Sequence, residues 1–386
     1  MSGRDKMLKA ITEGTLTEIP VVIPYIGIFL RDHWEEITNE PWWIQNSWNL
    51  ESRIRVDKAL EEKIDIDWMS CRLCPSSVWR LSHQIKVRNN EVYLVGTYPA
   101  YQGSVEKLHR PPPGGVQGSL SRRVREGTSL PKPLIESEKD VEKYVTVIKA
   151  EELIKSGMLD YAKEVVKEFH SRRFIVAPVT SPLWTAYSYF GFKGLIVNLY
   201  RNPRLIEFLL EKLTMQQREC IEAFARVGVD GIWIEECLCS ADVISLRNFK
   251  KFTLPYVCEL ISEIRKQKMK SIYYPCGDVS DRLELMVEAE PDCISLEESK
   301  KNFTIDLEWV DKVVNGRVCI FGNLDAVAVL QNGTLEELKS ELERQIRIGR
   351  EHGRFVMSLG SPVTPQTPTS RVREYVDFTR VLSQQL

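Results

Sequence analysis

The sequence predicts a single (β/α)₈ barrel over residues 1–386, because short apolar segments alternate along the chain with amphipathic helical segments. Eight segments have the length of strands, and they are largely apolar throughout, which is typical of a parallel sheet covered by helices on both faces. Eight parallel strands close a barrel. An open doubly wound sheet is the alternative, but no Gly-x-Gly-x-x-Gly turn follows the first segment.

The expected strands are spread over the whole chain, and they begin at Pro20, Asp65, Arg173, Gly231, Lys270, Asp292, Arg317 and Arg354. Between them lie long helical patterns, including residues 202–228 and 335–353. The second of these ends in Gly353 directly before a strand, as expected of a helix C-terminus.

One stretch, residues 84–117, departs from this alternation. Asn89 and Asn90 separate two alternating runs, which predicts a β-hairpin, and the following RPPPGGVQG predicts a loop. We expect this stretch to be an insertion after the second strand, on the active-site side of the barrel, and not a second domain.

Composition narrows the class of protein. The formal net charge of -2 and the pI of about 6.3 argue against a general nucleic-acid or membrane-surface binder. The first residues are polar, and no apolar run approaches the roughly 20 residues that span a bilayer. We therefore expect a cytoplasmic protein whose nine cysteines are thiols or metal ligands.

Polar residues at the carboxyl ends of barrel strands are the first candidates for function. Glu236 ends the segment GIWIEE, and Cys276 closes the next strand. Adjacent strands lie about 4.8 Å apart, so these two ends are close enough to share a metal ion. A thiolate with a carboxylate suits zinc, which predicts that Glu236 and Cys276 are both zinc ligands and catalytic residues. The alternative is a buried cysteine beside a solvated glutamate.

A catalytic zinc site usually has three protein ligands, and the third is left open here among Cys237, Asp278 and Glu297. The pair Cys71 and Cys74 forms a lone C-x-x-C, for which inert or loop-lining thiols are the favoured interpretation.

Four tryptophans follow the first strand: Trp34, Trp42, Trp43 and Trp48. They could stack a flat apolar substrate or form a hydrophobic plug over the barrel mouth.

Several segments carry a resemblance to a known family. TSPLWTAYSYFGFKGLIVNLYRNPRLIEFLLEKLT, GVDGIWIEE, YYPCGD, GNLDAVAVL and SLGSPVTPQTPTSRVREYVD resemble uroporphyrinogen decarboxylases and their methyltransferase relatives. The resemblance runs from about Arg173 to the C-terminus and is weak over the first third of the chain.

Departures from the decarboxylase pattern point to the methyltransferase branch. The early stretch YIGIFLRDHWEEITNEPWW has one arginine where decarboxylases carry an arginine-rich motif, and Ser361 stands where they have histidine. The coenzyme M methyltransferases have His-x-Cys at the YYPC turn, where this chain has Tyr274 and keeps Cys276. A site with Cys276 and Glu236 is more similar to zinc-dependent methyltransferases that demethylate methoxylated aromatic compounds.

The resemblance therefore implies an O-demethylating methyltransferase, which moves the methyl group of an aryl methyl ether to the Co(I) corrinoid of a partner protein. Zinc would be the resident cofactor, and Trp42, Trp43, Tyr187 and Asn323 would line the substrate pocket. The alternatives are a methylcorrinoid:coenzyme M or folate methyltransferase, and a metal-free ligand-binding or decarboxylating barrel. The oligomeric state is left open, with a homodimer as the candidate.

Overall fold

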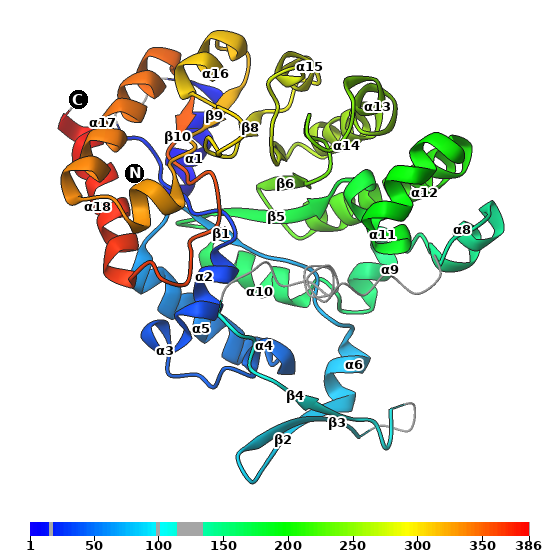
Figure 1. The fold of residues 1–386 in the computed structure, drawn as a ribbon. Coiled ribbons are helices and arrows are strands. Elements are labelled where there is room, and N and C mark those ends of the chain that lie inside the picture. Colours follow the sequence, from blue (N-terminus) through cyan, green and yellow to red (C-terminus); the bar gives the residue numbers. More distant parts are fainter. Residues whose placement is uncertain (15–17, 98–100, 114–133, 386) are drawn as a thin grey trace.

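The computed structural model describes residues 1–14, 18–97, 101–113 and 134–385. Its main sheet consists of seven parallel strands in the order β1-β5-β6-β7-β8-β9-β10. The sheet is curled, and helices cover its outer side (Figure 1). The strands are β1 (Trp68–Ser70), β5 (Phe174–Thr180), β6 (Gly231–Glu236), β7 (Lys270–Pro275), β8 (Cys293–Ser295), β9 (Cys319–Phe321) and β10 (Phe355–Val356).

The first of the eight expected strands is reduced to a short segment around Val21. The Asp67 N–H donates to the Val21 carbonyl oxygen at 2.9 Å, and the Val22 N–H donates to the Met357 carbonyl oxygen at 2.9 Å. The segment thus bonds just before β1 on one side and just after β10 on the other. It stops early because Tyr25 takes a left-handed conformation and α2 begins at Ile26.

The helices alternate with the strands as the sequence predicts. They are α1 (Gly3–Thr12), α2 (Ile26–Asp32), α3 (Trp34–Ile37), α4 (Ile44–Ser47), α5 (Leu50–Ile64), α6 (Ser77–Ser82), α8 (Glu138–Tyr144), α9 (Ala150–Lys155), α10 (Asp160–Phe169), α11 (Pro182–Arg201), α12 (Pro203–Arg226), α13 (Leu246–Phe252), α14 (Leu254–Lys266), α15 (Leu283–Glu288), α16 (Leu307–Val314), α17 (Leu335–His352), α18 (Thr369–Gln385) and the π-helix η1 (Ala326–Gln331). In the described part of the chain, no helix is both long enough and apolar enough to cross a membrane.

Helix α17 shows why the elements form where they do. Thr334 and Glu337 make a reciprocal capping box at its start, which satisfies two backbone donors that the helix leaves free. Gly353 follows its last residue with φ of 90°, a conformation that glycine adopts without steric cost. The predicted helix end at Gly353 is confirmed.

A separate antiparallel sheet lies between β1 and β5 in the chain and apart from the main sheet in space (Figure 1). Strands β2 (His83–Arg88) and β3 (Glu91–Gly96) are joined through Asn89 and Asn90, which both have positive φ, and β4 (Val105–Leu108) pairs with β3. The predicted hairpin at the Asn-Asn pair is therefore confirmed. The end of the predicted insertion, residues 114–117, lies outside the described residues.

Candidate functional site

A cavity of about 610 Å³ lies between the main sheet and the N-terminal helices α2 and α5. This volume is in the range of pockets that hold small organic ligands. On the sheet side, all three residues of β1 line the cavity, together with Val176 and Pro178 of β5 and Trp233 and Glu235 of β6. The residues from β5 and β6 are every second one along each strand, so they mark the face of the sheet that is turned inward.

The inward face of β6 carries Glu235 and not Glu236. Trp233 lies on the same face, with its ring centroid 4.8 Å from that of Tyr274 in β7 and 5.6 Å from that of Trp68 in β1. Alternation within the strand then directs Ile234 and Glu236 toward the surrounding helices. Glu236, the predicted zinc ligand, therefore lies on the outer face of the sheet and not on the face that lines the cavity.

Glu236 is fully buried at the start of α11. Its carboxyl accepts hydrogen bonds from the Ser181 hydroxyl, at the N-cap of this helix, and from the Leu238 N–H at 2.7 Å. Burial raises the pKa of Glu236 to about 7, and the two hydrogen bonds offset part of this shift. The arrangement therefore links β6 to α11 and holds a carboxyl group that can keep its proton near neutral pH.

The partner of Cys276 is Cys237. The pairing of β6 with β7 sets Glu235 opposite Tyr274 and Glu236 opposite Pro275, so the next residues along the chain, Cys237 and Cys276, face each other. Their sulfur atoms lie 3.0 Å apart. Cys237 was one of the residues considered for the third metal ligand, and the structure brings it to Cys276 directly.

Glu235 joins this thiol pair to the cavity. Its Oε1 atom accepts a hydrogen bond from the Tyr25 hydroxyl at 2.9 Å and lies 3.6 Å from Sγ of Cys237. Burial raises the pKa of Glu235, and these two contacts work against that shift. Tyr25 keeps its proton, because burial raises its pKa well above 10.

Both thiols keep their protons near neutral pH. The hydrogen bond with Cys237, followed by burial, raises the pKa of Cys276 well above its usual value near 9. The same hydrogen bond lowers the pKa of Cys237, but burial and the Glu235 carboxylate outweigh it, so that this pKa is also raised. A metal ion that bound here would therefore have to displace protons.

The donor atoms of this group fit zinc in their chemistry, since two thiols and a carboxyl are ligands that zinc prefers. Among the residues that the structure describes, however, no group of three or more His, Cys, Asp or Glu side chains is placed to hold a metal ion. Tetrahedral zinc with Zn–S bonds of about 2.3 Å keeps its sulfur ligands roughly 3.7 Å apart. The sulfurs of Cys237 and Cys276 would thus have to separate by roughly 0.7 Å to bind zinc together.

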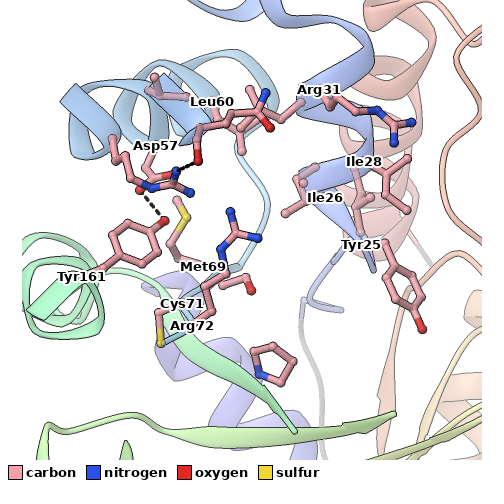
Figure 2. Close-up of a pocket in the computed structure, with 18 of the residues that line it drawn as sticks. Tyr25, Ile26, Ile28, Arg31, Asp57, Leu60, Met69, Cys71, Arg72 and Tyr161 are labelled. Atoms are coloured by element: carbon pink, nitrogen blue, oxygen red, sulfur yellow. Dashed lines mark hydrogen bonds between the residues drawn. The ribbon is translucent and has the colours of Figure 1, made fainter. Parts of the chain in front are cut away.

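Three arginines also line the cavity, and sequence reasoning missed this group. Arg31 comes from α2, Arg53 from α5, and Arg72 from the segment after β1. Only Arg31 belongs to the early stretch in which the sequence showed one arginine. The other two are far from it in the chain, and the fold brings all three to the lining of the same cavity. Figure 2 shows two of them, Arg31 and Arg72.

The four residues that were predicted to bind substrate lie outside this cavity. Trp42 and Trp43 pack against the small sheet and line a second depression of about 330 Å³ with residues of β3 and β4. Tyr187 is buried in α11 with its ring centroid 5.4 Å from that of Trp184. The Asn323 side chain donates to the carbonyl oxygens of residues 297 and 305, at 3.2 and 2.9 Å. The tryptophans that line the main cavity are Trp34, Trp48, Trp68 and Trp233.

The remaining candidates have other surroundings. Glu297 accepts a hydrogen bond from the Gly277 N–H at 3.1 Å, and Asp278 accepts one from the Ser280 N–H at 2.9 Å. Cys71 lines the cavity, and burial raises its pKa. Cys74 lies 3.3 Å from the carbonyl oxygen of Gly157, and both cysteines are free thiols.

A curled parallel sheet with polar side chains at the carboxyl ends of its strands, next to a cavity, is the arrangement found in proteins of the β/α-barrel class. Comparison with known proteins identifies the family. The profile of uroporphyrinogen decarboxylase (URO-D) matches residues 119–382, so the chain belongs to the uroporphyrinogen decarboxylase family. The resemblance seen in the sequence is confirmed, and it reaches further toward the N-terminus than the quoted segments indicated.

Relatives in this family include both decarboxylases and methyltransferases. Uroporphyrinogen decarboxylase of Chlorobaculum tepidum is 25% identical over 263 residues, which cover 64% of this chain and 70% of that protein. Methylcobamide:CoM methyltransferase MtbA of Methanosarcina mazei is 23% identical over 180 residues, covering 47% of this chain and 50% of MtbA. A solved methyltransferase from Methanosarcina mazei has the same fold, with a TM-score of 0.66 and 17% identity over 98% of both chains.

Proposed function

We propose that this protein is a corrinoid-dependent methyltransferase that demethylates aryl methyl ethers. The observation that carries the proposal is the pair Cys237 and Cys276, placed with Glu235 at the edge of a cavity with aromatic walls. The reaction takes an aryl methyl ether, a proton and the Co(I) corrinoid of a partner protein, and it gives the phenol and methyl-Co(III). The carbon–oxygen bond of the methyl group breaks, and a carbon–cobalt bond forms.

Cys237, Cys276 and Glu235 are the residues that would hold zinc, with Cys276 retained from the sequence prediction and Glu235 taking the place of Glu236. Bound zinc supplies a Lewis acid that polarises the ether oxygen, because a phenolate is a poor leaving group near neutral pH. Glu236 then acts as a positioning residue, whose hydrogen bonds to Ser181 and Leu238 fix the end of β6.

The walls of the cavity suit a flat ring. Trp68 and Trp233 stand edge to face at 5.6 Å, and Tyr25 contacts Trp233 in the same geometry at 6.2 Å. Aromatic side chains in these arrangements offer apolar faces and exclude water from a ligand between them. Tyr25 also donates to Glu235, so one residue both lines the cavity and orients the carboxyl group next to the thiols.

The test is methyl transfer with the purified protein, a panel of methoxybenzenes and methoxybenzoates, and free cob(I)alamin as the acceptor. Formation of methylcobalamin, followed by its absorbance, is the expected result. No transfer from any member of the panel, together with decarboxylation of an acidic substrate by a metal-free preparation, would contradict the proposal and support the decarboxylating alternative.

A methyltransferase that methylates a thiol from methylcobalamin is the second candidate, because the relative MtbA is a methylcobamide:CoM methyltransferase. The presence of two cysteines near the cavity is compatible with zinc activating a thiol substrate. Coenzyme M with methylcobalamin in the same assay separates the two directions. Fast thiol methylation without ether cleavage would favour this second candidate.

A further inference from the structure

Arg72 contributes a positive charge to the lining of the cavity. Its side chain is exposed to the cavity space, and in the described part of the chain it forms no ion pair and no hydrogen bond. Its guanidinium lies over the Trp48 ring, 5.3 Å from the centroid. Figure 2 shows Arg72 standing in the cavity between the Asp57–Tyr161 pair and residues Ile26 and Ile28 of α2.

A second guanidinium lies on the same tryptophan. Arg53 is 4.1 Å from the centroid of Trp48 and 5.1 Å from that of Tyr161, and its Nη1 donates to the carbonyl oxygen of Gln45 at 3.1 Å. Its Nε is buried without a partner. Burial lowers the pKa of Arg72 most, and the positive charge of Arg53 lowers it further, so the two cations repel each other. Two adjacent cations without bound anions are costly to keep away from bulk water.

Asp57 is a carboxyl group on which the charges of both arginines act, and one carboxylate cannot neutralise two guanidiniums. Asp57 accepts a hydrogen bond from the Tyr161 hydroxyl at 2.9 Å, and no ion pair joins it to either arginine in the part of the chain described. Burial raises the pKa of Asp57 to about 6, against the effect of Arg53. At neutral pH two guanidiniums therefore face one carboxylate, and this end of the cavity keeps a positive charge.

The rest of the cavity lining is largely apolar and aromatic and includes Glu235, which lies beside the thiol pair. A ligand that matches this lining has an anionic group for the two arginines and a flat ring for the aromatic walls. A guanidinium binds a carboxylate with two parallel hydrogen bonds, and it also stacks on aromatic rings. The Arg72 guanidinium already lies over the Trp48 ring, and among the described residues none accepts a hydrogen bond from it, so its donors are available to a ligand.

We propose that Arg72, with Arg53 beside it, binds the carboxylate of an aromatic acid, so that the methyl donor is a methoxybenzoate and not an uncharged methoxybenzene. That the ligand carries a methoxy group depends on the proposed demethylation, whereas the recognition of its carboxylate does not. Arg72 is thus a residue that determines which substrates bind, and it takes no part in breaking the carbon–oxygen bond.

The experiment measures binding without any corrinoid. Purified protein is titrated with 4-methoxybenzoate and with methyl 4-methoxybenzoate, which lacks the charge, and quenching of tryptophan fluorescence reports binding. The wild-type protein should bind the acid at least 10-fold more tightly than the ester. Arg72→Gln should weaken binding of the acid by 10-fold or more and leave the ester unchanged, and Arg72→Lys should retain part of the preference.

Arg347→Gln is the matched control, because it removes one positive charge from an exposed arginine on α17 that pairs with Glu343. It should bind both compounds as the wild type does. Equal binding of acid and ester by the wild type, or full acid affinity in Arg72→Gln, would overturn the proposal. The comparison of acid and ester binding by the wild-type protein needs no variant, so it tests carboxylate recognition even if Arg72→Gln does not fold. A clear acid preference without methyl transfer would reject only the demethylation.

Discussion

The sulfur atoms of Cys237 and Cys276 lie 3.0 Å apart, at the point where β6 and β7 end side by side. Their proximity follows from the register of the two strands, in which each residue of β6 lies opposite the residue 39 positions later in the sequence. Since side chains that face each other across parallel strands lie on the same side of the sheet, both thiols point inward, as Glu235 does. The candidate metal site is therefore assembled by strand register and not by a local sequence motif.

Removal of either thiol should lower the zinc content of the protein. We expect about one zinc per chain after purification in zinc-containing medium and less than a third of that in Cys237→Ser and in Cys276→Ser, because thiolates are the tightest ligands in the group. Metal analysis by mass spectrometry measures this. Cys258→Ser, which changes a half-buried thiol on α14, should keep full zinc. Full zinc in both site variants would remove this pair from the metal site.

Glu236 should make stability depend on pH. Its pKa of about 7 in the folded protein exceeds the usual value near 4.5, so the folded state holds an extra proton between these two pH values. The free energy of unfolding should then fall as pH rises from 4.5 to 7, by about 3 kcal/mol from this group. Glu236→Gln removes that contribution, and urea unfolding at pH 4.5 and pH 8 measures the difference. The same change with pH in both proteins would show that Glu236 does not titrate in this way.

Replacing Gly231 at the start of β6 by a larger residue should destabilise the protein. A Cβ atom there would lie 2.7 Å from the Phe174 ring of the neighbouring strand, so Gly231→Ala should lower the free energy of unfolding by about 1–3 kcal/mol. Gly194→Ala is the control in α11, where the new Cβ would lie 3.4 Å from its nearest neighbour. It should stabilise the protein by about 0.5–1 kcal/mol, because alanine favours helix. Equal stability of the two variants would contradict the described packing of β6 on β5.

Much of the fold could be predicted from the sequence, because burial on both sides of a parallel sheet leaves continuous apolar runs. Seven of the expected strands appear, and the Asn89–Asn90 hairpin and the end of α17 at Gly353 are where the pattern placed them. The first strand is shorter than expected. Its apolar run extends to Ile26, but the left-handed Tyr25 ends the extended conformation, and a pattern of apolar residues does not reveal such a turn.

The site was harder to predict, because a run that is apolar on both faces does not say which face is inner. Glu235 and Glu236 are adjacent in sequence, and only one of them can point to the cavity. A signal was present in the aromatic residues: Trp68, Trp233 and Phe321 contact one another across the interior, whereas Ile232 and Ile234 face the helices. No local sequence pattern indicates that Arg53 and Arg72 line the same cavity, because α5 and the end of β1 come together only in the folded protein.

The most direct test of the account is to compare Glu235→Gln with Glu236→Gln in methyl transfer from 4-methoxybenzoate to cob(I)alamin. Glu235 contacts both Cys237 and Tyr25, whereas both oxygens of Glu236 are bonded on the outer side of β6. We expect Glu235→Gln to lower kcat/KM by at least 100-fold, a loss of about 2.7 kcal/mol of transition-state stabilisation. Glu236→Gln should retain more than a tenth of the wild-type value. A large loss in Glu236→Gln with wild-type transfer in Glu235→Gln would contradict this expectation.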